Sequence, residues 1–347
     1  MLDPDRYKKQ MEARSNALVV IETTIFVCIT VTALLGNLMV CWAVYRSKKL
    51  RTMSNIYIIA LAIFDILMAT LCMPLSVEVS IVPVYKHSNK VIQFQGFFTF
   101  FLSLASIQTM TAMAINRFYR IVKPKLYRAH FNSMKKLIVS LVVIVVLATL
   151  GASLPLIFGF ATYIFHYGKV FSYIRYLTPA AAYTYTIFLK IFYITIPTLI
   201  TLFCYYKIFK EVQTHSRAMK TNRRASSSGL TMNVEEVKIT RALFATVVGF
   251  VACWTPVAVI DMIDTFSNHN VNQPRQIYLM YIYLGYGSSS INPFIYGILN
   301  RSFRNEFVKI FRLKLGAKQS STDAETSRSA VSSHMPRANA STITPVQ

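Results

Sequence analysis

Seven long apolar runs, separated by shorter polar segments, dominate the pattern of hydrophobic and polar positions along the chain. A helix needs about 20 consecutive apolar residues to cross the hydrocarbon core of a bilayer. Seven such runs exceed what a soluble core uses, and the short alternating strands of a membrane barrel are not visible. The pattern therefore predicts an all-α membrane protein, a bundle of seven transmembrane helices. The predicted spans are residues 23–45, 56–75, 91–115, 137–165, 182–209, 242–260 and 277–299.

Composition and charge agree with this prediction. Hydrophobic residues make up 54% of the chain and charged residues 15%, whereas soluble domains carry about 25% charged residues. The net charge is +23, and 27 of the 37 Lys and Arg residues lie in the odd-numbered connections and the C-terminal segment. Basic connections face the cytoplasm, so the N-terminus is expected outside. The charge therefore indicates orientation in an anionic bilayer rather than nucleic-acid binding.

The ends of the chain differ from its centre. Residues 1–16 contain no apolar core of a signal peptide and are expected to form a short extracellular N-terminus. Residues 17–313 form the predicted helical domain. Residues 314–347 are rich in Ser, Thr and Ala, which predicts a disordered cytoplasmic tail whose hydroxyl groups are open to phosphorylation.

Polar residues inside the predicted spans are candidates for function, because burying them in a membrane is costly. Asp65 lies in the middle of the second span and is expected to face the bundle interior. Small polar residues of two other spans could complete an oxygen-lined sodium site with it. The alternative is an aspartate hydrogen-bonded to waters. The predicted sodium ligands are Asp65, Ser106, Ser288, Ser289 and Asn292.

Three prolines lie within late spans: Pro197, Pro256 and Pro293. Proline removes a backbone donor, so kinks are expected there, and such helices suit a switch between two arrangements. Arg117 ends the third span on the basic side, and Glu236 begins the sixth on the same side. A pair between them would hold the two helix ends together, although exposed pairs commonly contribute little.

These residues, taken together, resemble rhodopsin-like (class A) G-protein-coupled receptors over roughly residues 20–313. Six motifs occur in the family's order, one helix after another. They are Gly36-Asn37, Leu61-Ala62-x-x-Asp65, Asn116-Arg117-Phe118, Pro197 with Tyr205, Phe250-x-x-Cys253-Trp254-x-Pro256 and Asn292-Pro293-x-x-Tyr296. Phe303 fits the family's short amphipathic eighth helix.

The resemblance implies a plasma-membrane receptor and not an enzyme. A ligand from outside would contact helices 3, 5, 6 and 7, and Trp254 and Phe250 would repack. Helix 6 would swing outward, and Arg117 would leave Glu236 to meet a heterotrimeric G protein. Arrestin and receptor kinases would act through the tail. The implied switch and coupling residues are Asn116, Arg117, Pro197, Tyr205, Glu236, Phe250, Pro256, Pro293 and Tyr296.

The chain departs from the family in its cysteines. The family's usual cysteine at the top of helix 3 is replaced by Ile92, and the loop of about residues 165–183 contains no cysteine. No disulfide is therefore expected to hold this loop over the ligand pocket. All five cysteines are predicted to be buried small apolar residues: Cys28, Cys41, Cys72, Cys204 and Cys253.

Within the family, the chain is most similar to melatonin receptors. Thr99 replaces the aspartate of amine receptors, and Tyr286 replaces the lysine that holds retinal in opsins. Asn116, Tyr286 and the segment from Tyr296 to Arg304 resemble melatonin receptors, but Ala258 replaces their usual asparagine in helix 6. The ligand is therefore expected to be a small molecule, with a melatonin-like indoleamine as one candidate.

The candidate pocket contains polar and aromatic side chains. Lys190 and Asp261 could face each other, either as a structural pair or as contacts of a polar or zwitterionic ligand. Aromatic side chains suit a flat ligand, although such runs are more often packing. The predicted ligand contacts are Gln95, Thr99, Ser103, Lys190, Trp254, Asp261, Tyr283 and Tyr286.

Other functions remain as alternatives. The chain could be a class A receptor for another small molecule or a short peptide, or a decoy receptor that does not signal. A transporter would show internal repeats, a light-driven pump would need the retinal lysine, and an intramembrane enzyme would need a motif such as HExxH or GxSxG. None of these features is seen in the sequence.

Overall fold

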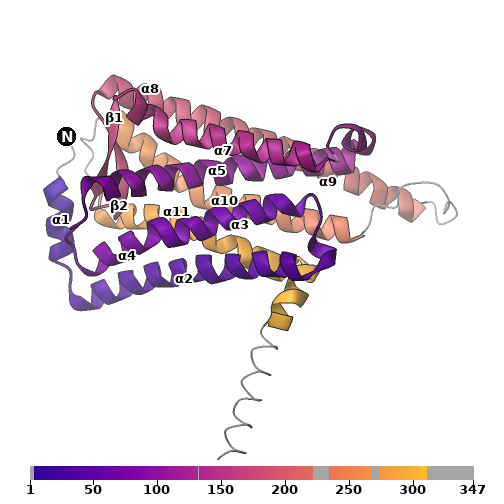
Figure 1. Cartoon of the computed structure of the whole chain (residues 1–347), viewed down its shortest axis with the longest axis horizontal. Helices are drawn as coiled ribbons and strands as arrows, with labels where there is room; N and C mark the ends of the chain where they lie inside the picture. Colours follow the sequence, from indigo (N-terminus) through magenta and orange to yellow (C-terminus); the bar gives the residue numbers. More distant parts are fainter. Residues whose placement is uncertain (1–3, 132, 222–233, 268–272, 311–347) are drawn as a thin grey trace, which may run out of the picture. The chain divides into compact units, whose positions relative to one another are not determined.

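The computed structural model describes residues 4–131, 133–221, 234–267 and 273–310 (Figure 1). The chain divides into two compact units, Met1–Arg304 and Asn305–Gln347, and each is described by itself. The first unit is a helical bundle with one β-hairpin. Its elements are α1 (Pro4–Glu12), α2 (Asn16–Arg46), η1 (Lys48–Leu50), α3 (Asn55–Leu67), η2 (Met68–Cys72), α4 (Met73–Ile81), α5 (Asn89–Val122), α6 (Pro124–Leu126), η3 (Tyr127–Phe131), α7 (Met134–Ile157), β1 (Ala161–His166), β2 (Phe171–Tyr176), α8 (Pro179–Leu189), η4 (Lys190–Thr195), α9 (Ile196–Thr221), α10 (Val234–Phe266) and α11 (Arg275–Leu299).

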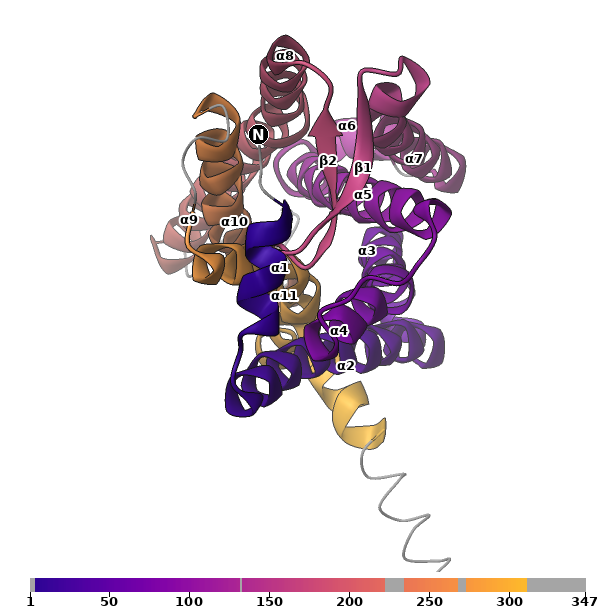
Figure 2. The same ribbon diagram turned by 90° about the vertical axis from the view of Figure 1, so that its left-hand side faces the viewer.

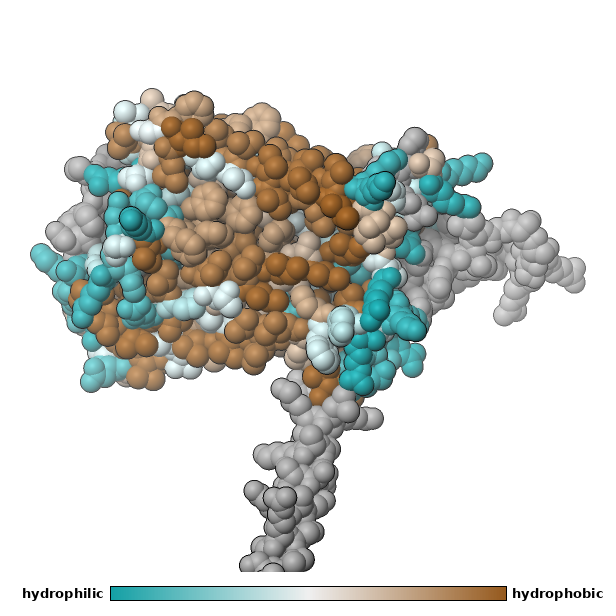
Figure 3. Space-filling view, viewed as in Figure 1, coloured by the Kyte–Doolittle hydropathy of each residue, from teal (hydrophilic) through white to brown (hydrophobic). Residues whose placement is uncertain are grey.

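Seven long helical stretches cross the first unit, which confirms the predicted seven-helix bundle. Six of them are long and apolar enough to span a membrane. The seventh, α11, is less apolar because a cluster of buried polar residues lies in it, among them Ser288, Ser289 and Asn292. Hydrophobic residues form a band around the middle of the visible face, and hydrophilic residues collect at the two ends (Figure 3). This is the surface that a bilayer requires of a spanning bundle.

Two of the spans contain a π-helical turn. In the second span, η2 joins α3 to α4 and precedes Pro74. In the fifth, η4 joins α8 to α9 and precedes Pro197. Proline lacks an N–H and disrupts the regular i to i−4 ladder, and a π turn accommodates the disruption. α10 and α11 continue through Pro256 and Pro293.

The first and last spans pack closely around Pro293. This proline leaves the carbonyl of Ser289 without its helical N–H donor. Asn37 Nδ2 donates to that carbonyl at 3.0 Å. Gly36 permits the approach, because a Cβ on it would lie 2.7 Å from Pro293 Cγ. The Gly36-Asn37 pair thus supplies both the space and the hydrogen bond that the proline of α11 requires.

The fourth predicted span, residues 137–165, was too long. α7 ends at Ile157, and Gly159 follows with a φ of +67°, a conformation that glycine adopts readily at helix ends. The next residues form β1, which pairs antiparallel with β2 from Ala161↔Tyr176 to His166↔Phe171. The loop without cysteines is therefore a β-hairpin, whose first strand is made of residues that hydrophobicity alone assigned to a helix.

The N-terminal segment also forms an element that the sequence did not predict. The short helix α1 lies with the β-hairpin at one end of the bundle, here called the hairpin end (Figure 2). Tyr7 and Met11 of α1 are buried, and the Tyr7 hydroxyl donates to the carbonyl of Gln273 at 2.9 Å. Just after α1, Arg14 pairs with Glu22, which also binds Arg275. These contacts fix the N-terminal segment to the start of α11.

A helix follows α11 over residues 301–310, which confirms the predicted eighth helix. Asn300 begins it, because its Oδ1 accepts a hydrogen bond from the backbone N–H of Ser302 at 3.1 Å. Phe303 is fully buried, and its ring stacks on Tyr296 with 5.5 Å between the centroids. The predicted tail, residues 314–347, lies outside the described residues.

Candidate functional site

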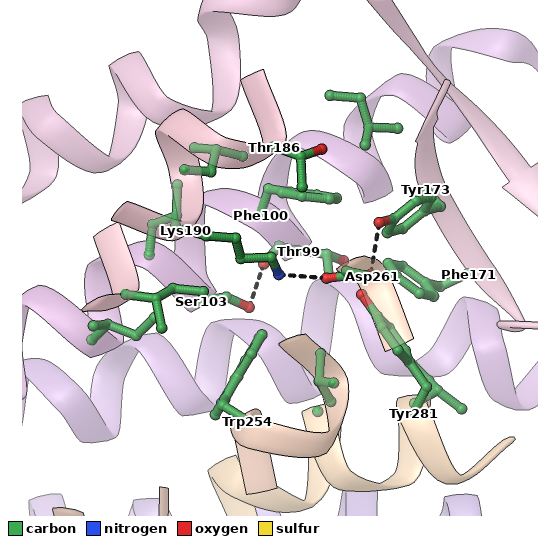
Figure 4. A pocket seen from close by; sticks show the side chains of 18 of the residues that line it. Thr99, Phe100, Ser103, Phe171, Tyr173, Thr186, Lys190, Trp254, Asp261 and Tyr281 are labelled. Atoms are coloured by element: carbon green, nitrogen blue, oxygen red, sulfur yellow. Dashed lines mark hydrogen bonds and ion pairs between the residues drawn. The ribbon is translucent and has the colours of Figure 1, made fainter. Parts of the chain in front are cut away.

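A cavity with a volume of about 80 Å³, here called the main cavity, lies near the hairpin end of the described bundle. Side chains from α5, η4, α10 and α11 form its walls, and residues of β2 form its roof (Figure 4). Most of its surface is apolar and aromatic. A few polar groups interrupt it, which is the usual composition of a small-molecule site.

An ion pair crosses one side of this cavity. Lys190 Nζ lies 2.7 Å from Asp261 Oδ2, which confirms that the two side chains face each other. The other carboxylate oxygen accepts a 2.7 Å hydrogen bond from the Tyr173 hydroxyl (Figure 4). Burial, and then the carboxylate of Asp261, raise the pKa of Tyr173 well above its usual value, so its hydroxyl remains a donor. The pair joins η4 to α10 below the hairpin.

The cavity includes six of the eight predicted ligand contacts. They are Thr99, Ser103, Lys190, Trp254, Asp261 and Tyr286. The hydroxyl of Thr99 is buried beside the side chains of Cys72 and Tyr286, with no partner at ordinary hydrogen-bond geometry. The Tyr286 hydroxyl is used by Ser76 at 3.1 Å, and the cavity meets the rest of its side chain. The cavity therefore has a few hydroxyl groups among apolar walls.

Gln95 and Tyr283 do not line the cavity. The hydroxyl of Tyr283 donates to the carbonyl of Glu22 at 3.2 Å, and its ring packs on Phe26 of α2. Gln95 is fully buried, and its amide nitrogen donates to the carbonyl of Cys72 at 3.1 Å. Both side chains serve contacts between elements of the protein, and their role as ligand contacts stays a prediction that this cavity does not support.

Gln95 instead holds the hairpin in place. Its Oε1 accepts hydrogen bonds from the N–H of Ser172 at 3.1 Å and from the hydroxyl of Ser172 at 2.7 Å. Two residues earlier in α5, Gln93 Nε2 donates to the carbonyl of Tyr163 at 2.7 Å, and Oε1 accepts from the Tyr163 N–H at 3.2 Å. Each strand is thus bonded to one glutamine of α5. Polar contacts do here what a disulfide would otherwise do.

The five cysteines are all free, but the prediction that all are buried is only partly correct. Cys72, Cys204 and Cys253 are buried, whereas Cys41 is half-buried and Cys28 is exposed. Cys28 lies on α2, the first span, of which only a small part is covered by the rest of the bundle. An apolar residue can face lipid there as readily as the bundle core.

A second, smaller cavity lies next to the main one and shares Ser103 and Trp254 with it. Its volume of about 10 Å³ has room for roughly one water molecule or ion. All five predicted sodium ligands line it: Asp65, Ser106, Ser288, Ser289 and Asn292. Asn292 Nδ2 donates to Asp65 Oδ2 at 2.9 Å. This donor set is rich in oxygen and has one carboxylate, so it fits a hard monovalent cation.

Trp254 connects the two cavities. Its indole N–H donates to the hydroxyl of Ser288 at 3.1 Å, and its ring stacks on Phe250 with 5.5 Å between the centroids. Both aromatic residues lie on α10, one turn apart. A change in the main cavity can therefore reach the small polar cavity through a single side chain.

Some of the predicted switch and coupling residues lie toward the other end of the bundle. Arg117, Tyr205 and Tyr296 come from three different helices, and each is only 1% exposed. Asn116 Oδ1 accepts a hydrogen bond from the Ser54 hydroxyl at 2.9 Å, which links α5 to the start of α3. Glu236 lies on α10 but outside the described side chains, so its predicted pair with Arg117 stays a prediction.

The hairpin adds residues to the site that the sequence did not suggest. Phe171, Tyr173 and Tyr176 of β2 line the cavity. The aromatic and β-branched residues of Phe171–Tyr176 were a signal for a strand. Lys169, in the turn, is buried against Asp261 and Asp264. Nothing in the sequence distinguishes this lysine from a solvated loop residue.

The sequence model of the 7 transmembrane receptor (rhodopsin family) matches residues 36–296. Melatonin receptor type 1B-B of Danio rerio is 27% identical over 302 residues, which cover 86% of this chain and 83% of the relative. Melatonin receptor type 1A of Ovis aries is 27% identical over 290 residues, 83% of this chain and 76% of the relative. 5-Hydroxytryptamine receptor 4 of Cavia porcellus is 27% identical over 315 residues, 84% of this chain and 79% of the relative.

Proposed function

Because the chain belongs to the rhodopsin family of seven-transmembrane receptors, we propose that it binds an extracellular small molecule in the main cavity and activates heterotrimeric G proteins. One observation carries this proposal. The cavity is bounded on one side by the hairpin and on the other by Trp254. The Trp254 ring stacks on Phe250, and both residues also line the second cavity. A ligand in this position touches the helix whose movement couples such receptors.

The mechanism is a shift between two packings of the bundle. A ligand that contacts Trp254 disturbs the hydrogen bond from Trp254 to Ser288 and the stacking of the Trp254 ring on Phe250. α10 then moves relative to α11 and α5 at the far end, where Arg117 becomes available to the G protein. A ligand with equal affinity for both packings would leave their populations unchanged.

The orientation follows from charge. The basic connections after α2 and after α5 lie at the end opposite the hairpin (Figure 1), and such connections remain in the cytoplasm. The hairpin end and the N-terminus therefore face outward, and the G protein binds at the Arg117 end. Arrestin and receptor kinases are further expected partners through the C-terminal tail, residues 314–347, which lies outside the described residues.

A melatonin-like indoleamine is the first candidate ligand. Two of the relatives named above are melatonin receptors. The walls of the cavity suit a flat aromatic molecule, since they include Tyr281, Trp254 and Phe171. Thr99 offers its hydroxyl where an amine receptor would offer a carboxylate. Another small molecule or a short peptide is the second candidate, and a decoy receptor without signalling is the third.

Sodium is the proposed allosteric ion of the second cavity. Asp65 and the oxygens of Ser106, Ser288, Ser289 and Asn292 would hold it. A bound cation would supply a positive charge beside the carboxylate and stabilise the packing in which these groups converge. No lysine occupies position 286, so a covalent retinal is not expected.

The test measures G-protein activation in cells that express the full chain. The cells receive indoleamines, other biogenic amines and short peptides. An active ligand is expected to raise nucleotide exchange, and Arg117→Ala is expected to abolish the response while surface expression stays largely intact. A full response from Arg117→Ala would contradict the assigned coupling role. Good surface expression without response to any ligand, and without basal activity, would favour the decoy.

A further inference from the structure

Lys169 is an unusual residue for the tip of a loop. It lies in the turn between β1 and β2, yet its side chain is only 1% exposed. Its ammonium lies 3.3 Å from Asp261 Oδ1 and 3.2 Å from Asp264 Oδ2. Transfer of a lysine from water to such a position is costly unless other groups compensate its charge. The groups that contact the ammonium therefore show how its charge is compensated.

Aromatic rings complete the surroundings of the ammonium. Lys169 Nζ lies 3.6 Å from the centre of the Tyr173 ring, 4.3 Å from that of Tyr281 and 5.4 Å from that of Tyr278. Ring faces at these distances attract a cation, most strongly where water is excluded. Two carboxylates and three tyrosines from β2, α10 and α11 thus surround one ammonium. This is a complete binding site for a primary amine, occupied by a residue of the same chain.

The turn holds Lys169 in this position. Its backbone N–H donates to His166 Nδ1 at 3.0 Å, and Val170 N–H donates to the His166 carbonyl at 2.8 Å. Val170 adopts a φ of +57°, which is strained for a β-branched residue. Tyr7 of α1 packs on His166 with 5.6 Å between the ring centroids. The residue that holds the turn thus contacts the N-terminal helix.

The charges of this cluster cancel. Lys169 and Lys190 face Asp261 and Asp264, and hydroxyl groups provide further hydrogen bonds to the carboxylates. Tyr173 donates to Asp261 at 2.7 Å, and Tyr278 donates to Asp264 at 2.9 Å. Neither carboxylate is left to compensate a charge brought by a ligand. An ammonium that entered the cavity would have to displace a lysine or remain unpaired.

We propose that Lys169 is a built-in ligand: the hairpin places its ammonium in a site made of carboxylates and tyrosine rings, so that the cavity below accepts an uncharged aromatic molecule and excludes primary amines. The selectivity part of this inference rests on the proposed function, because it requires that a ligand bind the main cavity. The ammonium site itself does not depend on signalling.

The first experiment tests the ammonium site in the purified full chain. Lys169→Ala removes the atoms beyond Cβ, and n-propylammonium has the same size and charge as the part removed. The variant is expected to have a lower melting temperature than the wild type, and millimolar n-propylammonium is expected to recover more than half of the loss. Equal concentrations of sodium chloride or 1-propanol are expected to recover none. Lys86→Ala, which changes an exposed lysine of another loop, is the matched control and is expected to show neither effect.

A double variant guards against failure of the single one to fold. Lys169→Ala with Asp264→Asn leaves the same hole but one positive and one negative charge, Lys190 and Asp261. It is expected to bind n-propylammonium more weakly, through Asp261 and the tyrosine rings. If n-propylammonium stabilises neither variant more than the wild type, the ammonium site is refuted.

The second experiment tests selectivity with tryptamine and N-acetyltryptamine, which share a ring system and differ in charge. In the wild type, N-acetyltryptamine is expected to raise the melting temperature at a concentration at least tenfold lower than tryptamine. In Lys169→Ala, the concentration of tryptamine that raises the melting temperature is expected to be at least tenfold lower than in the wild type. Tryptamine that binds the wild type as well as its acetyl derivative would overturn the exclusion of amines. If neither compound binds while n-propylammonium still rescues, the indoleamine proposal is wrong and the ammonium site stands.

Discussion

Replacement of Gln95 by leucine is expected to release the hairpin from the bundle. Leucine has nearly the same size but cannot accept a hydrogen bond. Ser172 would lose both of its contacts to Gln95, the 3.1 Å bond from its N–H and the 2.7 Å bond from its hydroxyl. Ser172 is fully buried, so water cannot replace the lost partner.

The magnitude follows from these two groups. A buried donor left without a partner costs about 1–3 kcal/mol, so the amide and the hydroxyl together cost about 2–6 kcal/mol. If the hairpin detaches locally, this cost speeds amide exchange in β1 and β2 by a factor between roughly 30 and 25,000. If the cost falls on the whole bundle instead, the melting temperature drops by about 4–12 °C.

Hydrogen–deuterium exchange measured by mass spectrometry distinguishes these outcomes, because it reports β1 and β2 separately from the helices. Gln108→Leu is the matched control, since Gln108 lies on the same helix with a half-buried side chain away from the hairpin. It is expected to leave exchange in the hairpin unchanged. The assigned role of Gln95 would be refuted if Gln95→Leu and the wild type have the same melting temperature and equally slow exchange in residues 161–176.

Three further changes test other contacts. Gly96→Val places a Cβ 2.3 Å from Cγ of Tyr163 and is expected to displace β1; the double variant with Tyr163→Ala should be more stable than the sum of the single changes, by about 0.5–3 kcal/mol in the free energy of unfolding. Glu22→Gln removes the carboxylate that binds Arg275 and is expected to cost about 3–5 kcal/mol, with faster proteolysis before residue 16 as the readout. Asp65→Asn is expected to remove any effect of sodium, against N-methylglucamine, on basal nucleotide exchange; a sodium effect that persists would contradict the proposed ion site.

The helices could be predicted from the sequence because the bilayer constrains them directly. Every residue in a span meets either lipid or the bundle core, so each apolar run in the sequence corresponds to one transmembrane helix. The same constraint identified the polar exceptions. Asp65 and Asn292 are far apart in sequence, yet both had to face inward, and the structure joins them at 2.9 Å.

The hairpin could not be predicted in the same way, because its surroundings are set by other loops rather than by lipid. Residues 158–165 are apolar, so hydrophobicity alone extended the fourth helix through them. Gly159 was a usable signal for the helix end, and the aromatic and β-branched residues in 171–176 were one for a strand. The burial of Lys169 had no local signal, since it depends on Asp261 and Asp264, more than 90 residues away in the chain.

The absence of a disulfide and the burial of Lys169 have a common explanation in the path of the hairpin. A disulfide would fix one point of the loop whatever its side chains do. Here the loop is fixed by Gln93 and Gln95 at its strands and by Lys169 at its tip. All of these contacts are polar, and those of Gln95 and Lys169 are buried. Polar contacts of this kind depend on every partner being present. The contacts that position the hairpin therefore also set the charge of the cavity beneath it, so a change in the loop alters ligand selectivity and stability together.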